Sequence, residues 1–211
     1  MDSFVIERVA ETQRLEELLR YSGRQVRPKL ILVTGPPGIG KTTFVNSFAE
    51  NRMYPYEIYS DTASNLMNLE NSIAKNLNEL PRPGSLVDFS YFIDDAELLN
   101  RSSFERAYSQ ISNYKYCIAV VLAGRDQSDF LRNVPVSRTE TIRLGEFTDQ
   151  EAHNYIVKQL GHMQIPAHDV DYLVSSSRKI PFLLSQLIQA YRHHGLLGVN
   201  SHANQAIRFS G

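Results

Sequence analysis

Cysteine and tryptophan are almost absent from this sequence: among 211 residues there is one cysteine and no tryptophan. A single cysteine, Cys117, cannot form a disulfide within the chain, which excludes a disulfide-stabilised secreted fold and indicates a reducing compartment. Because Cys117 falls inside an apolar run, we expect it to be a core residue.

Long apolar runs and an excess of charge of one sign are lacking as well. No run approaches the roughly 20 residues that a membrane-spanning helix needs, and the acidic start Met1-Asp2 lacks the layout of a signal peptide. We therefore expect a cytoplasmic protein without membrane contacts. The formal net charge is −1, so no global basic field favours nucleic acid, although a local basic patch remains open.

Strand and helix patterns alternate over the first two thirds of the chain. Continuous or alternating apolar runs predict strands at 30–33, 56–59, 87–93, 116–123 and 141–144. Helical spacing predicts helices at 7–20, 41–50, 62–80, 104–111 and 127–132. In the first helix the apolar positions are Val9, Leu15, Leu18 and Leu19. This alternation is typical of an α/β fold with a mostly parallel sheet between helices, and we expect 30–33 to be a central strand.

Beyond Gly145 the pattern contains helices only, predicted at 149–160, 167–176 and 181–193. The apolar positions of the last of these are Phe182, Leu183, Leu187, Ile188 and Tyr191. We therefore expect an α/β core at 1–145 and a small three-helix lid at 146–196. The remainder, 197–211, is expected to be a loosely ordered tail or the start of a missing segment.

A phosphate-binding loop is predicted between the strand at 30–33 and the helix at 41–50. Its pattern is Gly-x-x-x-x-Gly-Lys-Thr, in which glycines allow backbone N–H groups to point at phosphate oxygens. The lysine reaches the β and γ phosphates, and the threonine hydroxyl coordinates Mg²⁺. The residues concerned are Gly35, Pro36, Pro37, Gly38, Ile39, Gly40, Lys41, Thr42 and Thr43. The strand before and the helix after give the motif the context it requires, so we expect this chain to bind ATP with Mg²⁺.

Two consecutive aspartates, Asp94 and Asp95, follow the predicted strand at 87–93. A hydrolysing site needs one carboxylate on the metal side and a second that orients or deprotonates the attacking water. We assign Asp94 to the metal and Asp95 to the water. The alternative is that either residue caps the next helix, since aspartate is a favoured N-cap.

At these residues the chain resembles the AAA+ superfamily, specifically the branch of origin-recognition ATPases, STAND signalling ATPases and small ATPases that assist transposition. The resemblance runs from about residue 4 to residue 191. It rests on the phosphate loop, the segment Tyr-Phe-Ile-Asp-Asp-Ala-Glu at 91–97 and the helical lid. It implies an AAA+-like P-loop NTPase that hydrolyses ATP and assembles with itself.

The resemblance also implies roles for several arginines. Arg125, after the strand at 116–123, resembles the sensor arginine of STAND proteins, and Arg138 matches the position of the intersubunit arginine finger in origin-recognition relatives. Arg178 is similar to the second sensor, and Pro181 to the proline of the lid's Gly-x-Pro motif, which contacts adenine. Lys179 stands where that motif has glycine. Each arginine has the alternative of being a solvated surface residue.

The sequence thus predicts an ATP-driven switch in which the lid closes on ATP, chains assemble, and hydrolysis to ADP releases the assembly. Expected catalytic residues are Lys41, Asp95, Arg125 and Arg138. Two alternatives stay open: a nucleotide-dependent binding module with little hydrolysis, and a P-loop kinase for a small acceptor. The client is open too, with DNA or a DNA-bound protein among the candidates.

Overall fold

The computed structural model describes residues 8–20, 28–52, 56–58, 89–96, 99, 101–113, 117–125, 139–161, 163 and 165–208. The chain divides into two compact units. Unit 1 comprises Met1–Pro36 with Lys41–Leu144, and unit 2 comprises Pro37–Gly40 with Gly145–Gly211. The middle of the predicted phosphate loop therefore belongs with the helical part of the chain, not with the sheet.

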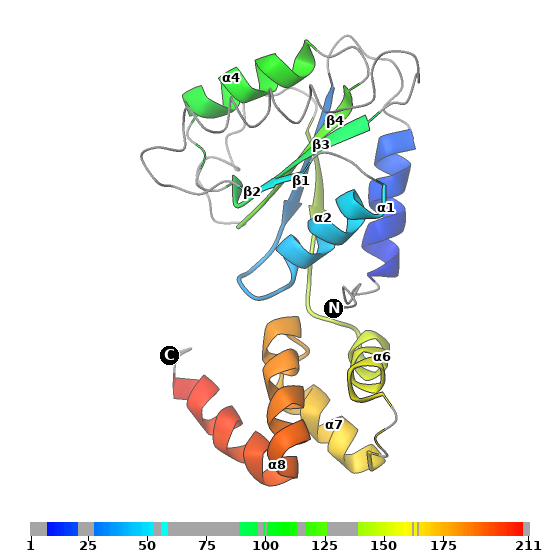
Figure 1. Ribbon diagram of the computed structural model, residues 1–211, viewed down its shortest axis with the longest axis vertical. Helices are drawn as coiled ribbons and strands as arrows, with labels where there is room; N and C mark the ends of the chain where they lie inside the picture. Colours follow the sequence, from blue (N-terminus) through cyan, green and yellow to red (C-terminus); the bar gives the residue numbers. More distant parts are fainter. Residues whose placement is uncertain are drawn as a thin grey trace. The chain divides into compact units, whose positions relative to one another are not determined.

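Unit 1 is built on a parallel five-stranded sheet with the order β2-β3-β4-β1-β5 (Figure 1). The strands are β1 (Lys29–Thr34), β2 (Tyr56–Ile58), β3 (Phe89–Asp94), β4 (Cys117–Gly124) and β5 (Thr139–Arg143). The predicted strand at 30–33 is interior, as a fully buried apolar run requires, but the central position belongs to β4. The strand pairs in the described part of the sheet are parallel, and Thr34 of β1 lies level with Gly124 of β4 and with Arg143 of β5.

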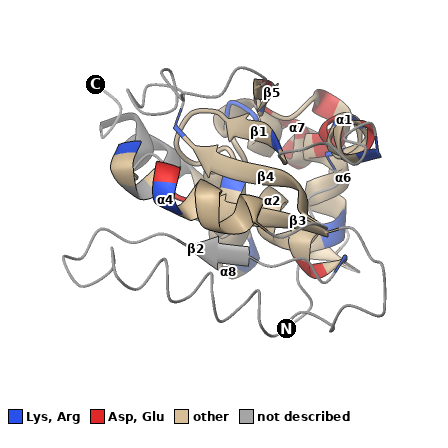
Figure 2. Cartoon of the chain, turned by 90° about the horizontal axis from the view of Figure 1, so that it is seen from above, with Lys and Arg blue, Asp and Glu red and all other residues tan. Residues whose placement is uncertain are grey.

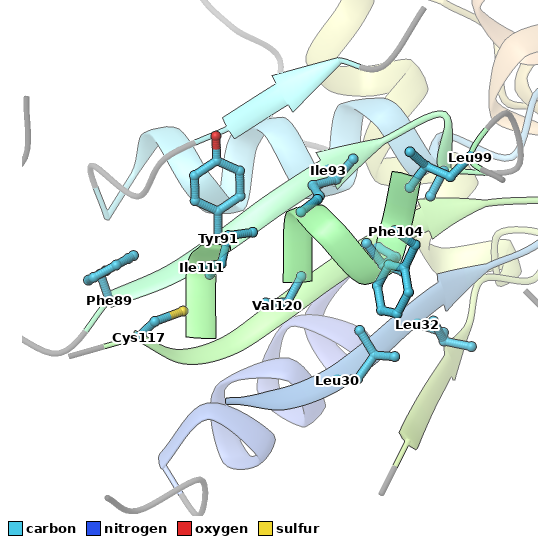
Figure 3. Close-up of a cluster of buried hydrophobic side chains, with 13 residues drawn as sticks. Leu30, Leu32, Phe89, Tyr91, Ile93, Leu99, Phe104, Ile111, Cys117 and Val120 are labelled. Carbon is cyan, nitrogen blue, oxygen red and sulfur yellow. The ribbon is translucent and has the colours of Figure 1, made fainter. Parts of the chain in front are cut away.

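Alternate residues of the strands face opposite sides of the sheet and meet different helices. On one side Leu30, Tyr91 and Val120 join Phe104 and Ile111 of α4 (Arg101–Ser112) in a buried cluster (Figure 3). The lone cysteine belongs to the same cluster and is 7% exposed, and burial raises the pKa of its thiol to about 12. The core role expected for this residue is confirmed.

The other side of the sheet is covered by α2 (Lys41–Glu50) and α1 (Val9–Arg20). The ring of Phe48 on α2 lies 5.8 Å from that of Phe92 on β3. Arg52, just after α2, forms an ion pair with Glu16 of α1 and stacks over Phe48 with its guanidinium carbon 3.9 Å from the ring centre. Helices on both faces explain why β3 and β4 read as nearly uncharged runs, drawn in tan in Figure 2.

Unit 2 contains α6 (Asp149–Leu160), α7 (Ala167–Ser176) and α8 (Pro181–Arg208). A capping box begins α6: the Thr148 hydroxyl accepts from the Glu151 N–H, and the Glu151 carboxylate accepts from the Thr148 N–H at 2.7 Å. A hydrogen bond of 2.6 Å from the Tyr191 hydroxyl to the buried carboxylate of Asp169 joins α8 to α7.

Several expectations need correction. Val9 is 56% exposed and Phe182 is 55% exposed, so neither is a core residue, whereas the three leucines of α1 are buried. The span of α8 to Arg208 consists of two helices that meet at a kink (Figure 1), where the backbone of Gly195 is non-helical, so the first ends near the predicted residue 193 and a second helix follows it. The expected tail at 197–211 is therefore helical over most of its length. The helices predicted at 62–80 and 127–132 lie outside the described residues.

Within the part of the chain that the structure describes, no helix combines the length and apolarity that crossing a membrane requires.

Candidate nucleotide site

The phosphate loop follows β1 directly and ends where α2 begins, as predicted. Lys41 is the first residue of α2, and its ammonium donates to the carbonyl oxygens of Gly35 at 2.9 Å and Pro36 at 3.1 Å. These bonds hold the lysine side chain back along the first residues of the loop. An ammonium in this position can exchange loop carbonyls for phosphate oxygens without leaving the loop.

Two glycines of the loop have backbone angles that other residues rarely adopt. The φ angle is +75° at Gly38 and +89° at Gly40. Between them Ile39 is 1% exposed, so its side chain anchors the loop in the interior while the neighbouring backbone turns. Gly40 is a fixed glycine of the motif and Gly38 occupies one of its variable positions, and at both the backbone geometry favours glycine.

Within unit 2 the loop meets the start of α8. The Phe182 N–H donates to the carbonyl oxygen of Gly38 at 3.1 Å. A Cβ atom added to Gly38 would lie 3.2 Å from the Cβ of Phe182 and 3.7 Å from Cγ2 of Ile180. Sequence reasoning missed this contact. The only signal was that Phe182 directly follows Pro181 in the first turn of the helix.

Asp94 and Asp95 stand at the carboxyl end of β3. Asp94 is the last residue of the strand and is 1% exposed, whereas Asp95 has a φ angle of +50° and is half-buried. The left-handed backbone of Asp95 is tolerated better by aspartate than by most residues, and such geometry is concentrated at functional sites. Two adjacent carboxylates therefore differ in setting, one in the interior and one at the surface.

The oxygen donors of unit 1 fit a magnesium ion. Thr42 is exposed in the first turn of α2, and Asp94 ends β3, two strands away from β1 in the sheet order. Strands two places apart are separated by about 10 Å, which leaves room for an ion with part of its water shell. Hydroxyl and carboxylate oxygens are the ligands that Mg²⁺ prefers.

Arg125 follows β4, the strand between β3 and β1, and its side chain is exposed. The residue before it, Gly124, pairs with Thr34 just ahead of the phosphate loop. The structure therefore brings Arg125 to the same edge of the sheet as the loop and Asp94. Arg138 lies outside the described residues, so its expected role as an intersubunit arginine finger stays a prediction.

The turn between α7 and α8 carries Arg178 and Lys179, both with positive φ angles of 51° and 59°. The Lys179 ammonium pairs with Asp149 at 3.4 Å. Both cations line a cavity of about 470 Å³ within unit 2, together with Asp149, His153, Asp171, Val174 and Ser175. Pro181 is buried as the first residue of α8. In the described contacts of this turn, the side chains that reach the phosphate loop are those of Ile180 and Phe182.

The chain matches no protein-family model. It is similar to the Holliday junction branch migration complex subunit RuvB of Trichormus variabilis, with 31% identity over 122 residues, which are 56% of this chain and 30% of that protein. The chain thus spans less than a third of that relative.

Solved structures resemble a larger share of the chain. The Walker-type ATPase paby2304 of Pyrococcus abyssi aligns with a TM-score of 0.69 and 15% identity, over 98% of this chain and 73% of that one. The RuvB Holliday junction branch migration motor of Thermotoga maritima aligns with a TM-score of 0.59 and 20% identity, over 87% and 60%. The fold of this chain is that of AAA+ P-loop ATPases, which confirms the predicted fold class.

Proposed function

We propose that this chain is an ATP-binding switch that hydrolyses ATP to ADP and phosphate in the presence of Mg²⁺. The observation that carries the proposal is the loop between β1 and α2, in which Gly38 and Gly40 have positive φ angles and the Lys41 ammonium donates to the carbonyl oxygens of Gly35 and Pro36. The likeness to RuvB proteins over 122 residues supports it. An alternative without turnover, a nucleotide-dependent binding module, differs from it only in the rate of hydrolysis.

Each role follows from the position of the residue. Backbone N–H groups of the loop and the Lys41 ammonium bind the phosphates, and the Thr42 hydroxyl with the Asp94 carboxylate holds the metal. Magnesium, when bound, neutralises charge that builds on the phosphates during transfer. Asp95, less buried than Asp94, orients the attacking water, and Arg125 stabilises the γ-phosphate from the end of β4.

The test of hydrolysis is phosphate release under multiple turnover, measured on the wild type and on Asp95→Asn. The variant is expected to bind Mg-ATP with unchanged affinity but to release phosphate at least about tenfold more slowly, because the water loses its carboxylate. Normal turnover by the variant contradicts the role of Asp95. Binding without turnover in the wild type favours the binding module.

Self-assembly is a further part of the proposal, supported by the resemblance at Arg138 to an intersubunit finger. An arginine supplied by a neighbouring chain can raise the rate by about 10³ or more. Mixing Lys41→Ala with Arg138→Ala chains should restore activity, because some interfaces then combine an intact loop with an intact finger. Mixed oligomers without recovered activity would remove Arg138 from the site.

The client is proposed to be DNA or a DNA-bound protein, since the relatives named above are subunits of a Holliday junction branch migration complex. A gel-shift with ATP, with ADP and without nucleotide tests this directly. The narrower assignment to the origin-recognition, STAND and transposition-helper branch is likewise proposed, and rests on Arg125, Arg138 and the lid. For Pro181 we propose the adenine contact, and for Arg178 a contact with the nucleotide once the ligand is bound.

A further inference from the structure

The cavity of about 470 Å³ in unit 2 lies between α6, α7 and the turn that leads into α8. Its lining includes Asp149 and His153 of α6, and Asp171 and Val174 of α7. The volume falls in the range of about 300–1,000 Å³ that is typical of small-molecule sites. Every lining residue belongs to unit 2, so this unit forms the cavity alone.

The charged side chains around this cavity have partners, with one exception among the residues that the structure describes. The Lys179 ammonium lies 3.4 Å from a carboxylate oxygen of Asp149, and Nε2 of His153 lies 3.4 Å from a carboxylate oxygen of Asp171. Arg178 lines the cavity and is exposed, and its guanidinium makes no ion pair or hydrogen bond with a described residue. The N–H donors of this guanidinium are therefore left for water or for a ligand in the cavity.

The backbone that carries Arg178 is strained and is held in place by hydrogen bonds. The φ angles of Arg178 and Lys179 are 51° and 59°, a region that residues other than glycine seldom adopt, least of all twice in succession. The buried hydroxyl of Ser177 accepts from the Lys179 N–H at 3.2 Å and donates to the Val174 carbonyl oxygen at 2.9 Å. The Lys179 carbonyl oxygen accepts from the Phe147 N–H at 2.9 Å. Strain of this kind is concentrated at functional sites, so it marks the turn as a candidate for ligand binding.

We propose that the cavity binds a carboxylate group on a short apolar stem, with the Arg178 guanidinium as its partner. A guanidinium matches a carboxylate with two parallel hydrogen bonds, and Val174, which is 8% exposed, gives the stem an apolar contact. A phosphate group fits less well, because its second negative charge is repelled by Asp149 and Asp171 in the same lining. A free monocarboxylate and a glutamate side chain of a polypeptide present the same group, and the test separates them.

The test is an NMR titration of the ¹⁵N-labelled full chain at constant ionic strength. Nucleotide is left out, so the result does not depend on the proposed function and the nucleotide contact proposed for Arg178 cannot compete. The probes are propionate, the acetylated and amidated peptide Gly-Glu-Gly, and the same peptide with glutamine in place of glutamate. The two carboxylates are expected to shift the Nε–H signal of Arg178 and the amide of Val174 saturably, with a Kd in the millimolar range that one bidentate pair supports. The glutamine peptide is expected to shift neither signal.

Arg178→Gln is expected to weaken binding of the glutamate peptide, followed at the Val174 amide, by about tenfold, the effect of one lost charge-assisted pair. Arg192→Gln is the matched control, because Arg192 is an exposed residue of α8 outside the cavity lining and its replacement makes the same change in net charge. The control is expected to stay within about twofold of the wild type. Tighter binding of the peptide than of propionate supports a polypeptide ligand, and equal binding supports recognition of the carboxylate alone. Absence of saturable shifts up to about 100 mM of either carboxylate, equal shifts with the glutamine peptide, or equal losses in Arg178→Gln and Arg192→Gln would overturn the proposal.

Discussion

Replacing Gly38 by alanine is opposed by two effects, an unfavourable backbone angle and a close neighbouring atom. Alanine substitutions at two other glycines of unit 2 allow the two effects to be measured separately. Gly38 has a φ angle of +75°, and an added Cβ would lie 3.2 Å from the Cβ of Phe182. Gly161 has a φ angle of +59° but no heavy atom within 4 Å of an added Cβ. Gly145 has neither a positive φ angle nor such a neighbour. The three substitutions therefore form a graded series.

The magnitudes follow from the separate costs. Gly145→Ala should leave the free energy of unfolding unchanged or raise it by about 0.4–1 kcal/mol, because alanine restricts the unfolded chain. Gly161→Ala should lower it by about 1–3 kcal/mol, the cost of holding alanine at a φ angle of 59° and a ψ angle of −119°, which residues other than glycine rarely adopt. Gly38→Ala should lower the free energy of unfolding by a backbone cost of the same kind plus about 1 kcal/mol or more of overpacking. The overpacking cannot be relieved by side-chain rotation, because the atoms that come too close are the Cβ atoms of residues 38 and 182.

Urea unfolding followed by circular dichroism measures the series, and titration with Mg-ATP measures the site. Gly38→Ala is expected to be the least stable of the three and the only one to lose nucleotide affinity, because its distortion lies in the loop itself. A Gly38→Ala chain as stable as Gly161→Ala, with wild-type affinity for Mg-ATP, would refute the contact with Phe182 and the need for glycine in the loop.

Two further predictions concern unit 2. Tyr191→Phe removes the 2.6 Å bond to buried Asp169 and should cost about 1.5–3 kcal/mol of unfolding free energy, measured by urea titration. Burial, and then the bond to Asp169, raises the pKa of Tyr191 from 10.0 to about 12, so its contribution is complete below pH 10 and is lost as the pH rises through 12. The stability of Tyr191→Phe should accordingly fall less than that of the wild type over this range; parallel curves would contradict the shift. Lys179→Gly should raise the melting temperature, because glycine relieves about 1 kcal/mol of strain at a φ angle of 59°. The exposed ion pair with Asp149 that is lost contributes little to stability. A lower melting temperature would show that the ion pair contributes more than the strain costs.

Much of the fold was predictable because uninterrupted apolar runs have few alternatives. The strand at 30–33 and the loop after it were located correctly, since β1 is buried on both faces and glycine is required where φ is positive. The strand order was not predictable in the same way, because periodicity does not say which strand pairs with which. That β4 lies between β1 and β3 is a property of long-range packing.

The candidate site was predictable to a different extent at each residue. The roles proposed for Lys41 and Asp94 rest on two motifs, each of which lies within a single strand and the residues that follow it. The exposure of Phe182 could not be predicted, because Phe182, Leu183 and Leu184 are consecutive apolar residues and the helical period alone does not decide that Leu184 is the buried one. The positive φ angles of Arg178 and Lys179 were equally hidden, since no glycine or asparagine marks that turn.

The central claim, that the loop binds ATP, is tested most directly by the melting temperature of the wild type and of Lys41→Ala with and without Mg-ATP. At a ligand concentration about 100 times Kd, linkage stabilises the folded chain by about 2.7 kcal/mol, or about 5–10 °C for a chain of this size. We expect this shift in the wild type, and at most a small fraction of it in Lys41→Ala. A wild-type melting temperature that Mg-ATP at millimolar concentration leaves unchanged, or an equal shift in Lys41→Ala, would contradict the claim.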